Sequence, residues 1–215
     1  MEFLRTRRLR ATGLQRASAS LDEVIISALL LSGLKNSEFC ALTVGDTVIG
    51  TGNSVFVVRG PSGRSRTVYI PRRASALVRQ YVSDVRPRFV APGVDPQDQS
   101  HALVLNEHRR PYERTGLYRR VVRILTEAGL GDRASVQLLR HTYGYLAYLR
   151  TGGNLLFVQR QLGHAHPRIT SVYAKLVDES YADLAERIVA GEPRAADVET
   201  GVCARRRPQF DCETD

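Results

Sequence analysis

The chain has 215 residues and a formal net charge of +9, so it is long enough for one well-buried core with tails. Such a basic balance favours a polyanionic partner, with DNA as the first candidate, although a basic surface without a dedicated ligand would have the same composition. No apolar run approaches the length of a membrane span, and no secretory signal precedes the three cysteines. We therefore expect a reduced, cytoplasmic protein with no membrane partner.

The cysteines do not indicate a metal centre. Cys203 and Cys212 lack a second Cys or His pair at ligand spacing, and a zinc site needs such a pair. We expect no metal ion.

The N-terminal segment is predicted to be a flexible basic arm over residues 1–19, because five arginines lie there among small and polar residues without a sustained apolar period. Order is expected from Ser20, which with Glu23 makes a capping box. The helix that follows should end at Gly33, which places Lys35 in the turn before a second helix.

Residues 48–71 change to a β pattern. Two β-rich runs flank a Gly-Pro-Ser-Gly turn at 60–63, which predicts a hairpin. Arg59, Arg64 and Arg66 cluster at its tip and are candidate DNA-binding residues, although a solvated hairpin end would carry the same side chains.

Helical spacing returns after the hairpin. Ser135 and Asn154 are N-cap residues by type, and Gly163 is a stop signal. The elements together predict a mainly α domain with a small β-hairpin sheet (α+β). The further helices are expected at 74–85, 117–128, 135–149 and 154–162.

Three side chains near one another in the sequence have the chemistry for attack on a phosphodiester. Arg140 can clamp phosphate oxygens through two parallel hydrogen bonds. His164 can bind a phosphate oxygen or move a proton. Tyr173 can form a covalent phosphotyrosyl bond, which splits strand breakage and rejoining into two easier steps without a metal or nucleotide.

Four strings of the chain, in order, match a known pattern. They are L-L-L-S-G-L-K-N-S-E at 29–38, the hairpin at 55–71, the segment 103–129, and L-R-H-T-Y at 139–143 with L-G-H at 162–164. This set resembles the tyrosine recombinases, the phage integrase family, over roughly residues 20–180. In that family a tyrosine follows the L-G-H string by nine residues, as Tyr173 does here.

The resemblance implies the tyrosine recombinase catalytic-domain fold over residues 20–190, followed by a polar, disordered tail over residues 191–215. It implies site-specific cleavage and rejoining of double-stranded DNA through a 3′-phosphotyrosyl intermediate. The expected assembly is a homo-oligomer on DNA, with no cofactor and no nucleotide. The family usually has an N-terminal helical clamp as well, which a short arm cannot supply, so the chain is a catalytic fragment or binds DNA from one side.

The same resemblance assigns catalytic positions. Tyr173 would be the nucleophile, because Tyr181 and the tyrosines within the predicted Arg140 helix lack the spacing from L-G-H and the latter fit core positions. Arg140 and His164 would keep the family's residues. The tyrosines of that helix are Tyr143, Tyr145 and Tyr148.

Three departures from the family pattern affect the expected activity. Lys35 stands at the position of the family's first Arg, and Gln137 stands where His or Lys is common; both remain candidate catalytic residues. The family's hairpin Lys, thought to protonate the leaving 5′ oxygen, has no counterpart between residues 36 and 174. Arg59 and Arg64 are the nearest basic groups, but a guanidinium is a poor proton donor. The alternative is a catalytically impaired or non-catalytic DNA-binding relative; a basic protein that binds RNA or another anion would leave the ordered matches unexplained.

Overall fold

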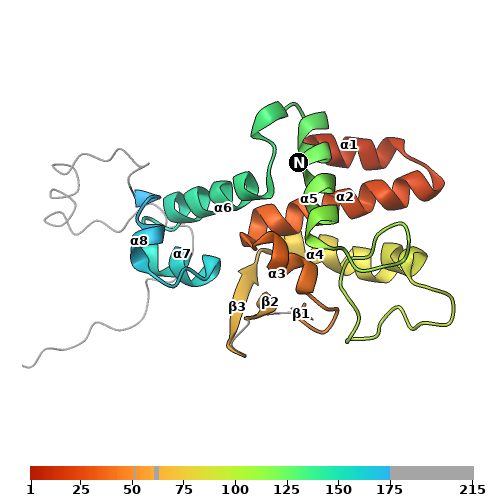
Figure 1. Cartoon of the computed structure of the whole chain (residues 1–215), viewed down its shortest axis with the longest axis horizontal. Helices are drawn as coiled ribbons and strands as arrows, with labels where there is room; N and C mark the ends of the chain where they lie inside the picture. The colour runs from red at the N-terminus through yellow and green to blue at the C-terminus, as the bar shows by residue number, and fades with distance from the viewer. Residues whose placement is uncertain (51, 61–62, 175–215) are drawn as a thin grey trace, which may run out of the picture.

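The computed structural model describes residues 1–50, 52–60 and 63–174 (Figure 1). Helices dominate, with one small sheet, which confirms the predicted fold class. The elements are α1 (Glu2–Arg10), α2 (Gly13–Ser32), α3 (Asn36–Ala41), β1 (Thr47–Val48), β2 (Ser54–Arg59), β3 (Ser65–Ile70), α4 (Arg72–Gln80), the π turn η1 (Tyr81–Val85), the 3₁₀ turn η2 (Arg86–Phe89), α5 (Arg114–Glu127), the 3₁₀ turn η3 (Gly131–Arg133), α6 (Val136–Arg150), α7 (Leu155–Leu162) and α8 (Pro167–Thr170).

The sheet is antiparallel in the order β1-β2-β3. Ser54 lies opposite Ile70, and Arg59 lies opposite Ser65, which confirms the predicted hairpin. Strand β1 was not predicted, since two residues are too few to show a period of two. The outer edge of β3 is covered by α7, where the Gln161 amide bonds to both backbone groups of Tyr69, at 3.0 and 3.1 Å.

The N-terminal segment is not the flexible arm that its composition predicted. Helix α1 lies along α2 (Figure 1) and buries Leu4. Arg7 pairs with Asp22 at 3.1 Å and with Glu127 at 2.9 Å, and Arg8 pairs with Glu23. Two of the five arginines thus have acidic partners on α2 and α5, which the sequence of the segment alone does not reveal.

The predicted capping box at Ser20 is also wrong. Helix α2 begins at Gly13, and Ser20 lies inside it with its hydroxyl donating to the Arg16 carbonyl at 2.8 Å. Glu23 is turned to Arg8 instead of capping the helix. The small and polar residues before Ser20 include residues that pack in the interior, since Ala17 and Ala19 are buried.

Two apolar clusters organise the chain. The larger one surrounds α2, which is buried throughout residues 21–29 and contacts α4, α5 and α6. The smaller one joins α7 and α8 to α6 through Val158, Leu162 and Tyr173. In Figure 1, α6 extends from the body and carries α7 and α8 at its far end, so the smaller cluster, together with the contact of α7 with β3, fixes their position. No helix among the described residues is both long and apolar enough to cross a membrane.

Candidate active site

Arg140 occupies the junction of three helices. It lies on α6, which begins as predicted after Ser135, whose Oγ accepts the Leu138 N–H at 3.0 Å. Its guanidinium is buried and donates to the carbonyl oxygens of Gly33 and, at 2.7 Å, of Leu162. These carbonyls belong to the C-terminal ends of α2 and α7, which carry partial negative charge. Two helix ends therefore hold the cation in place.

Both helix ends require glycine. Gly33 and Gly163 each have φ of +66°, in the left-handed region that favours glycine. A Cβ on Gly33 would lie 2.5 Å from Cδ1 of Tyr143, and one on Gly163 would lie 2.6 Å from Nε of Arg66. The predicted helix stops are confirmed, and close packing adds a second reason for them.

Tyr173 packs directly against α6. The residue is 2% exposed, and a Cβ on Gly144 would stand 2.4 Å from its Cζ. Its Oη lies 3.2 Å from Nδ1 of His141. Burial raises the pKa of the Tyr173 phenol, and the positive charge of Arg140 opposes that rise. The hydroxyl is therefore protonated at neutral pH in this arrangement.

The neighbouring tyrosines have structural positions. Tyr143 and Tyr148 pack against the Val158, Leu162 and Tyr173 cluster, which confirms that they are packing residues. Tyr145 is 36% exposed, so the prediction that it packs is wrong for this residue. Tyr181 lies outside the described residues, as do the predicted end of the domain at 190 and the tail at 191–215.

His164 follows directly on the glycine that ends α7, whose N-cap is Asn154 as predicted. Its Nδ1 lies 2.8 Å from the buried Thr170 hydroxyl. Burial lowers the pKa of His164 to about 4, with further lowering from the positive charges of Arg140 and Lys35. The imidazole is neutral at pH 7. Its other nitrogen, Nε2, is the one that can contact a substrate.

Lys35 is exposed and directly precedes α3. Its backbone N–H donates to Oε2 of Glu38 at 2.8 Å. The same carboxylate accepts two hydrogen bonds from Arg66, at 2.7 and 3.0 Å. Burial alone would raise the pKa of Glu38, but these hydrogen bonds bring it below its usual range. The Glu38 and Arg66 pair thus ties the turn at Lys35 to β3.

The three hairpin arginines differ in their surroundings. Arg66 is not a free residue at the tip, since its side chain is 23% exposed and paired with Glu38. Arg59 is 71% exposed and its Nη2 lies 2.8 Å from the Asp46 carboxylate. Arg64 is exposed beside the turn.

Gln137 and His141 lie one helical turn apart on α6, with Nε2 of each side chain 3.0 Å from the other. Sequence reasoning missed His141. Its signal was its place directly after Arg140 in the L-R-H-T-Y string. Glu38 was likewise part of a matched string without an assigned role.

The candidate residues converge where α2, α6, α7 and α8 meet. Arg140 bonds to the carbonyls of Gly33 and Leu162, which lie two residues before Lys35 and His164 in the sequence. Tyr173 packs on the same helix that carries Arg140. Such an arrangement can hold a phosphate by charge and hydrogen bonds next to a phenol. In the part of the chain that the structure describes, no three His, Cys, Asp or Glu side chains gather closely enough to hold a metal ion.

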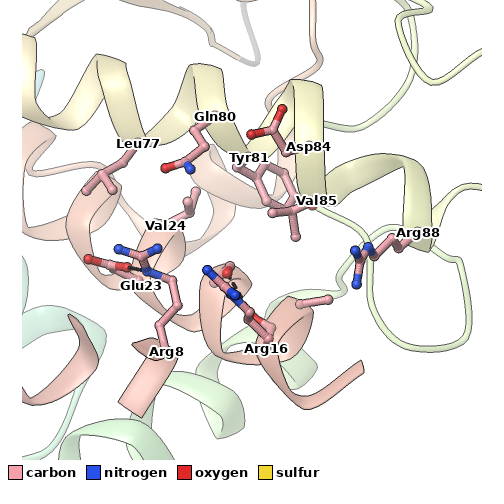
Figure 2. Close-up of a pocket in the computed structure, with 12 residues that line it drawn as sticks. Arg8, Arg16, Glu23, Val24, Leu77, Gln80, Tyr81, Asp84, Val85 and Arg88 are labelled. Atoms are coloured by element: carbon pink, nitrogen blue, oxygen red, sulfur yellow. Dashed lines mark hydrogen bonds and ion pairs between the residues drawn. The ribbon is translucent and has the colours of Figure 1, made fainter. Parts of the chain in front are cut away.

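A separate pocket of about 180 Å³ lies between α2 and the α4–η1 helix. Figure 2 shows Arg8 turned onto Glu23 at one side, with Arg16 and Arg88 farther along the rim. Its lining includes acidic as well as basic side chains and none of the residues at the Arg140 junction.

The fold and this junction define a tyrosine recombinase catalytic domain. The sequence profile of the phage integrase family matches residues 6–180, and the chain belongs to that family. It is 29% identical over 177 residues to tyrosine recombinase XerC of Roseiflexus sp., covering 82% of this chain and 53% of that protein. With tyrosine recombinase XerD of Oceanobacillus iheyensis it shares 27% identity over 164 residues, covering 76% and 52%.

Solved structures show the same fold. The XerH site-specific recombinase bound to its difH substrate superposes with a TM-score of 0.67 at 21% identity, covering 89% of this chain and 52% of that one. The XerA recombinase gives a TM-score of 0.62 at 24% identity, covering 90% and 65%. The chain spans about half the length of the curated relatives named above.

Proposed function

We propose that this chain cleaves and rejoins double-stranded DNA at specific sites, with Tyr173 as the nucleophile. The observation that carries this proposal is the meeting of a buried guanidinium, a neutral imidazole and a phenol at one helix junction. Family membership supports it, as do the names of relatives that are tyrosine recombinases. The XerH structure is a pre-cleavage complex with its difH substrate.

The reaction is a pair of transesterifications. The Tyr173 oxygen bonds to the scissile phosphorus, the bond from phosphorus to the 5′ oxygen breaks, and a 3′-phosphotyrosyl link forms. The phenol loses one proton and the departing 5′ oxygen gains one, so the step is balanced without a cofactor. A 5′ hydroxyl from another strand then reverses the chemistry and frees Tyr173.

Arg140, Lys35 and His164 contribute positive charge and hydrogen bonds to this reaction. Arg140 has N–H groups beyond the two that bond to carbonyls, and a guanidinium offers five, so the others can bind phosphate oxygens. Lys35 adds a second positive charge, and His164 can donate or accept through Nε2. Positioned charges of this kind are the main source of rate enhancement in phosphoryl transfer.

Tyr173 must become accessible before it reacts. The residue is 2% exposed, so a phosphate reaches the hydroxyl only after a shift of the atoms that cover it. We assign that shift to DNA binding.

The exposed arginines Arg59 and Arg64 face solvent and can follow the DNA backbone, which is the main source of affinity in such complexes. Arg66 supports the site from within through Glu38. Exchange between two duplexes cuts several strands, and each chain supplies one nucleophile. We therefore propose a homo-oligomer on DNA, acting in the cytoplasm.

The test uses duplexes selected by binding from a randomised pool and then nicked beside the preferred position. After cleavage the short strand diffuses away, which traps the protein-DNA adduct for detection on a denaturing gel. Wild-type protein should form the adduct. Tyr173→Phe should form none while it binds the same duplex with nearly unchanged affinity, because only one hydroxyl is removed. An adduct that persists in this variant, or that maps to Tyr181, would contradict the assignment, and binding without any wild-type adduct would indicate a non-catalytic relative.

A further inference from the structure

The hydroxyl of Tyr173 lies in a chain of polar contacts along one face of α6. Its Oη is 3.2 Å from Nδ1 of His141, and Nε2 of His141 is 3.0 Å from Nε2 of Gln137. Gln137 and His141 are four residues apart, so both project from the same side of the helix. The contact between His141 and Tyr173 joins α6 to the segment after α8.

The direction of each hydrogen bond follows from the donors available. An amide nitrogen can only donate, so Nε2 of His141 accepts the bond from Gln137. A neutral imidazole carries one proton, which must then be on Nδ1. Nδ1–H therefore donates to the oxygen of Tyr173.

We propose that His141 is a catalytic residue whose Nδ1–H stabilises the phenolate of Tyr173 as it attacks phosphorus, and that Gln137 is a positioning residue that holds His141 in this tautomer. The proposal rests on the function proposed above, because it assigns a role toward the same nucleophile. It also gives Gln137 a role that needs no proton exchange by its own side chain.

The oxygen of Tyr173 requires such a hydrogen-bond donor when it becomes charged. Burial disfavours the phenolate, and the two terminal nitrogens of Arg140 already donate to helix carbonyls. A hydrogen bond to a charged oxygen is about twice as strong as one to a neutral oxygen. The contact with His141 therefore strengthens as charge develops, which is the condition for lowering the barrier and not merely holding the ground state.

His141 does not take up the proton of Tyr173 in this scheme. That proton passes to water, and the departing 5′ oxygen takes one proton from water, so the step is balanced. The charged and titratable groups that act on the pair are Arg140 on the same helix and His164 beyond α7. Lys35 and Arg66 act on His164 from the turn before α3 and from β3.

The experiment isolates the nucleophile from the leaving group. A nicked substrate with sulfur at the 5′ bridging position needs no proton on departure, so the rate of adduct formation reports the state of Tyr173. The rate is measured from pH 6 to pH 10 for wild type, His141→Ala and His141→Asn. His108→Ala, an exposed loop histidine, is the matched control. Melting temperature and DNA affinity are measured for each protein.

At pH 7 the rate for His141→Ala should be roughly 10- to 100-fold lower, the effect of one hydrogen bond to a charged group. The deficit should persist up to pH 10, because burial holds the pKa of the Tyr173 phenol above its ordinary value and the phenol stays mainly protonated in both proteins. His141→Asn places an amide N–H near the position of Nδ1 and should recover most of the rate. The His108→Ala profile should match wild type.

Equal rates and equal pH profiles for His141→Ala and wild type would overturn the role of His141. An Asn variant as slow as the Ala variant would show that the imidazole must exchange a proton, which would overturn the donor assignment. Both outcomes leave the proposed function intact, provided that wild type forms an adduct and Tyr173→Phe does not. An adduct-free wild type would instead overturn the proposed function and the role of His141 with it.

Discussion

At the scale of single residues, the replacement of a guanidinium by an ammonium at position 35 stands out. Lys35 is exposed next to a junction whose other cation, Arg140, is buried and fixed by two carbonyls. An ammonium is a point charge on a flexible stem, whereas a guanidinium is a planar fork that matches two phosphate oxygens. The two positions therefore differ in how well they can hold a phosphate.

We expect Lys35→Arg to raise the rate of adduct formation, on the order of tenfold, because the fork adds a second hydrogen bond to phosphate. Arg140→Lys should lower the rate by about 10²-fold or more, because a lysine cannot bridge the ends of α2 and α7 and also contact phosphate. Single-turnover cleavage of the nicked duplex measures both, with Arg79→Lys on α4 as the control. Cleavage by Lys35→Arg that is equal to or slower than wild type would show that Lys35 does not clamp the phosphate in this way.

A second residue-scale prediction concerns stability and pH. The pKa of His164 is about 4 in the folded protein and about 6.5 in an unfolded chain. Between these values the unfolded state binds more protons, so stability rises with pH. The melting temperature should fall as pH drops from about 6.5 to about 4, and the fall should be shallower in His164→Gln.

Comparison of wild type with His164→Gln removes the contribution of carboxyl groups that titrate in the same range. His108→Gln, on an exposed loop, should keep the wild-type slope. Parallel melting curves for wild type and His164→Gln across this range would show that His164 is not held neutral by burial.

At the scale of elements, α6 carries Arg140 and also provides the surface against which Tyr173 packs. Gly144 lets the Tyr173 ring lie directly on the helix backbone, since any Cβ there would stand 2.4 Å from Cζ of the ring. The same ring belongs to the small cluster that docks α7 and α8. Displacement of Tyr173 would therefore loosen the segment that carries it as well as move the hydroxyl.

Two glycine variants test this packing. By helix propensity alone, Gly→Ala should stabilise a helix by up to about 1 kcal/mol. Gly144→Ala should instead cost about 1–3 kcal/mol, because the added methyl overpacks the contact with Tyr173, and it should change the cleavage rate. Gly116→Ala on α5 is the matched control, since its Cβ would meet Tyr112 at an ordinary 3.8 Å. Chemical denaturation measures the stability of both variants. An equal gain in stability for the two would contradict the close packing of Tyr173 on Gly144.

At the scale of the whole molecule, a buried ion pair joins α2 to α5. Nε of Arg120 lies 2.6 Å from Oδ1 of Asp22, and both residues are buried. Arg120 also bonds to Ser18 and Tyr112 at 2.8 Å, so a single side chain connects the long central helix with α5 and the loop before it.

Arg120→Met should destabilise the protein by about 3–5 kcal/mol, because it leaves the Asp22 carboxylate buried without its main partner. Arg123→Met removes a more distant charge, 3.9 Å from the same carboxylate and 52% exposed, and should cost less than about 1 kcal/mol. Addition of Asp22→Leu to Arg120→Met should recover part of the loss. Urea unfolding of the four proteins gives the comparison, and equal costs for the two arginine variants would contradict the importance of the buried pair.

The sequence by itself determined the features whose causes are local. Gly33 and Gly163 end their helices because glycine adopts the left-handed conformation at low cost, and Ser135 and Asn154 begin theirs because their side chains accept a nearby backbone N–H. The hairpin followed from turn residues between β-rich runs, and family spacing singled out Tyr173 among the tyrosines.

Only the tertiary structure decided which distant side chains meet. Arg7 and Arg8 of α1 pair with acids on α2 and α5, Arg66 is paired with Glu38 across 28 positions, and His141 reaches Tyr173 across 32 positions. Hydrophobic periodicity and capping signals report the conformation of a segment, not its neighbours in space. Charge patterns were therefore misjudged where the partner lay far along the chain, because an ion pair is created by the packing of helices and leaves no mark on either segment alone.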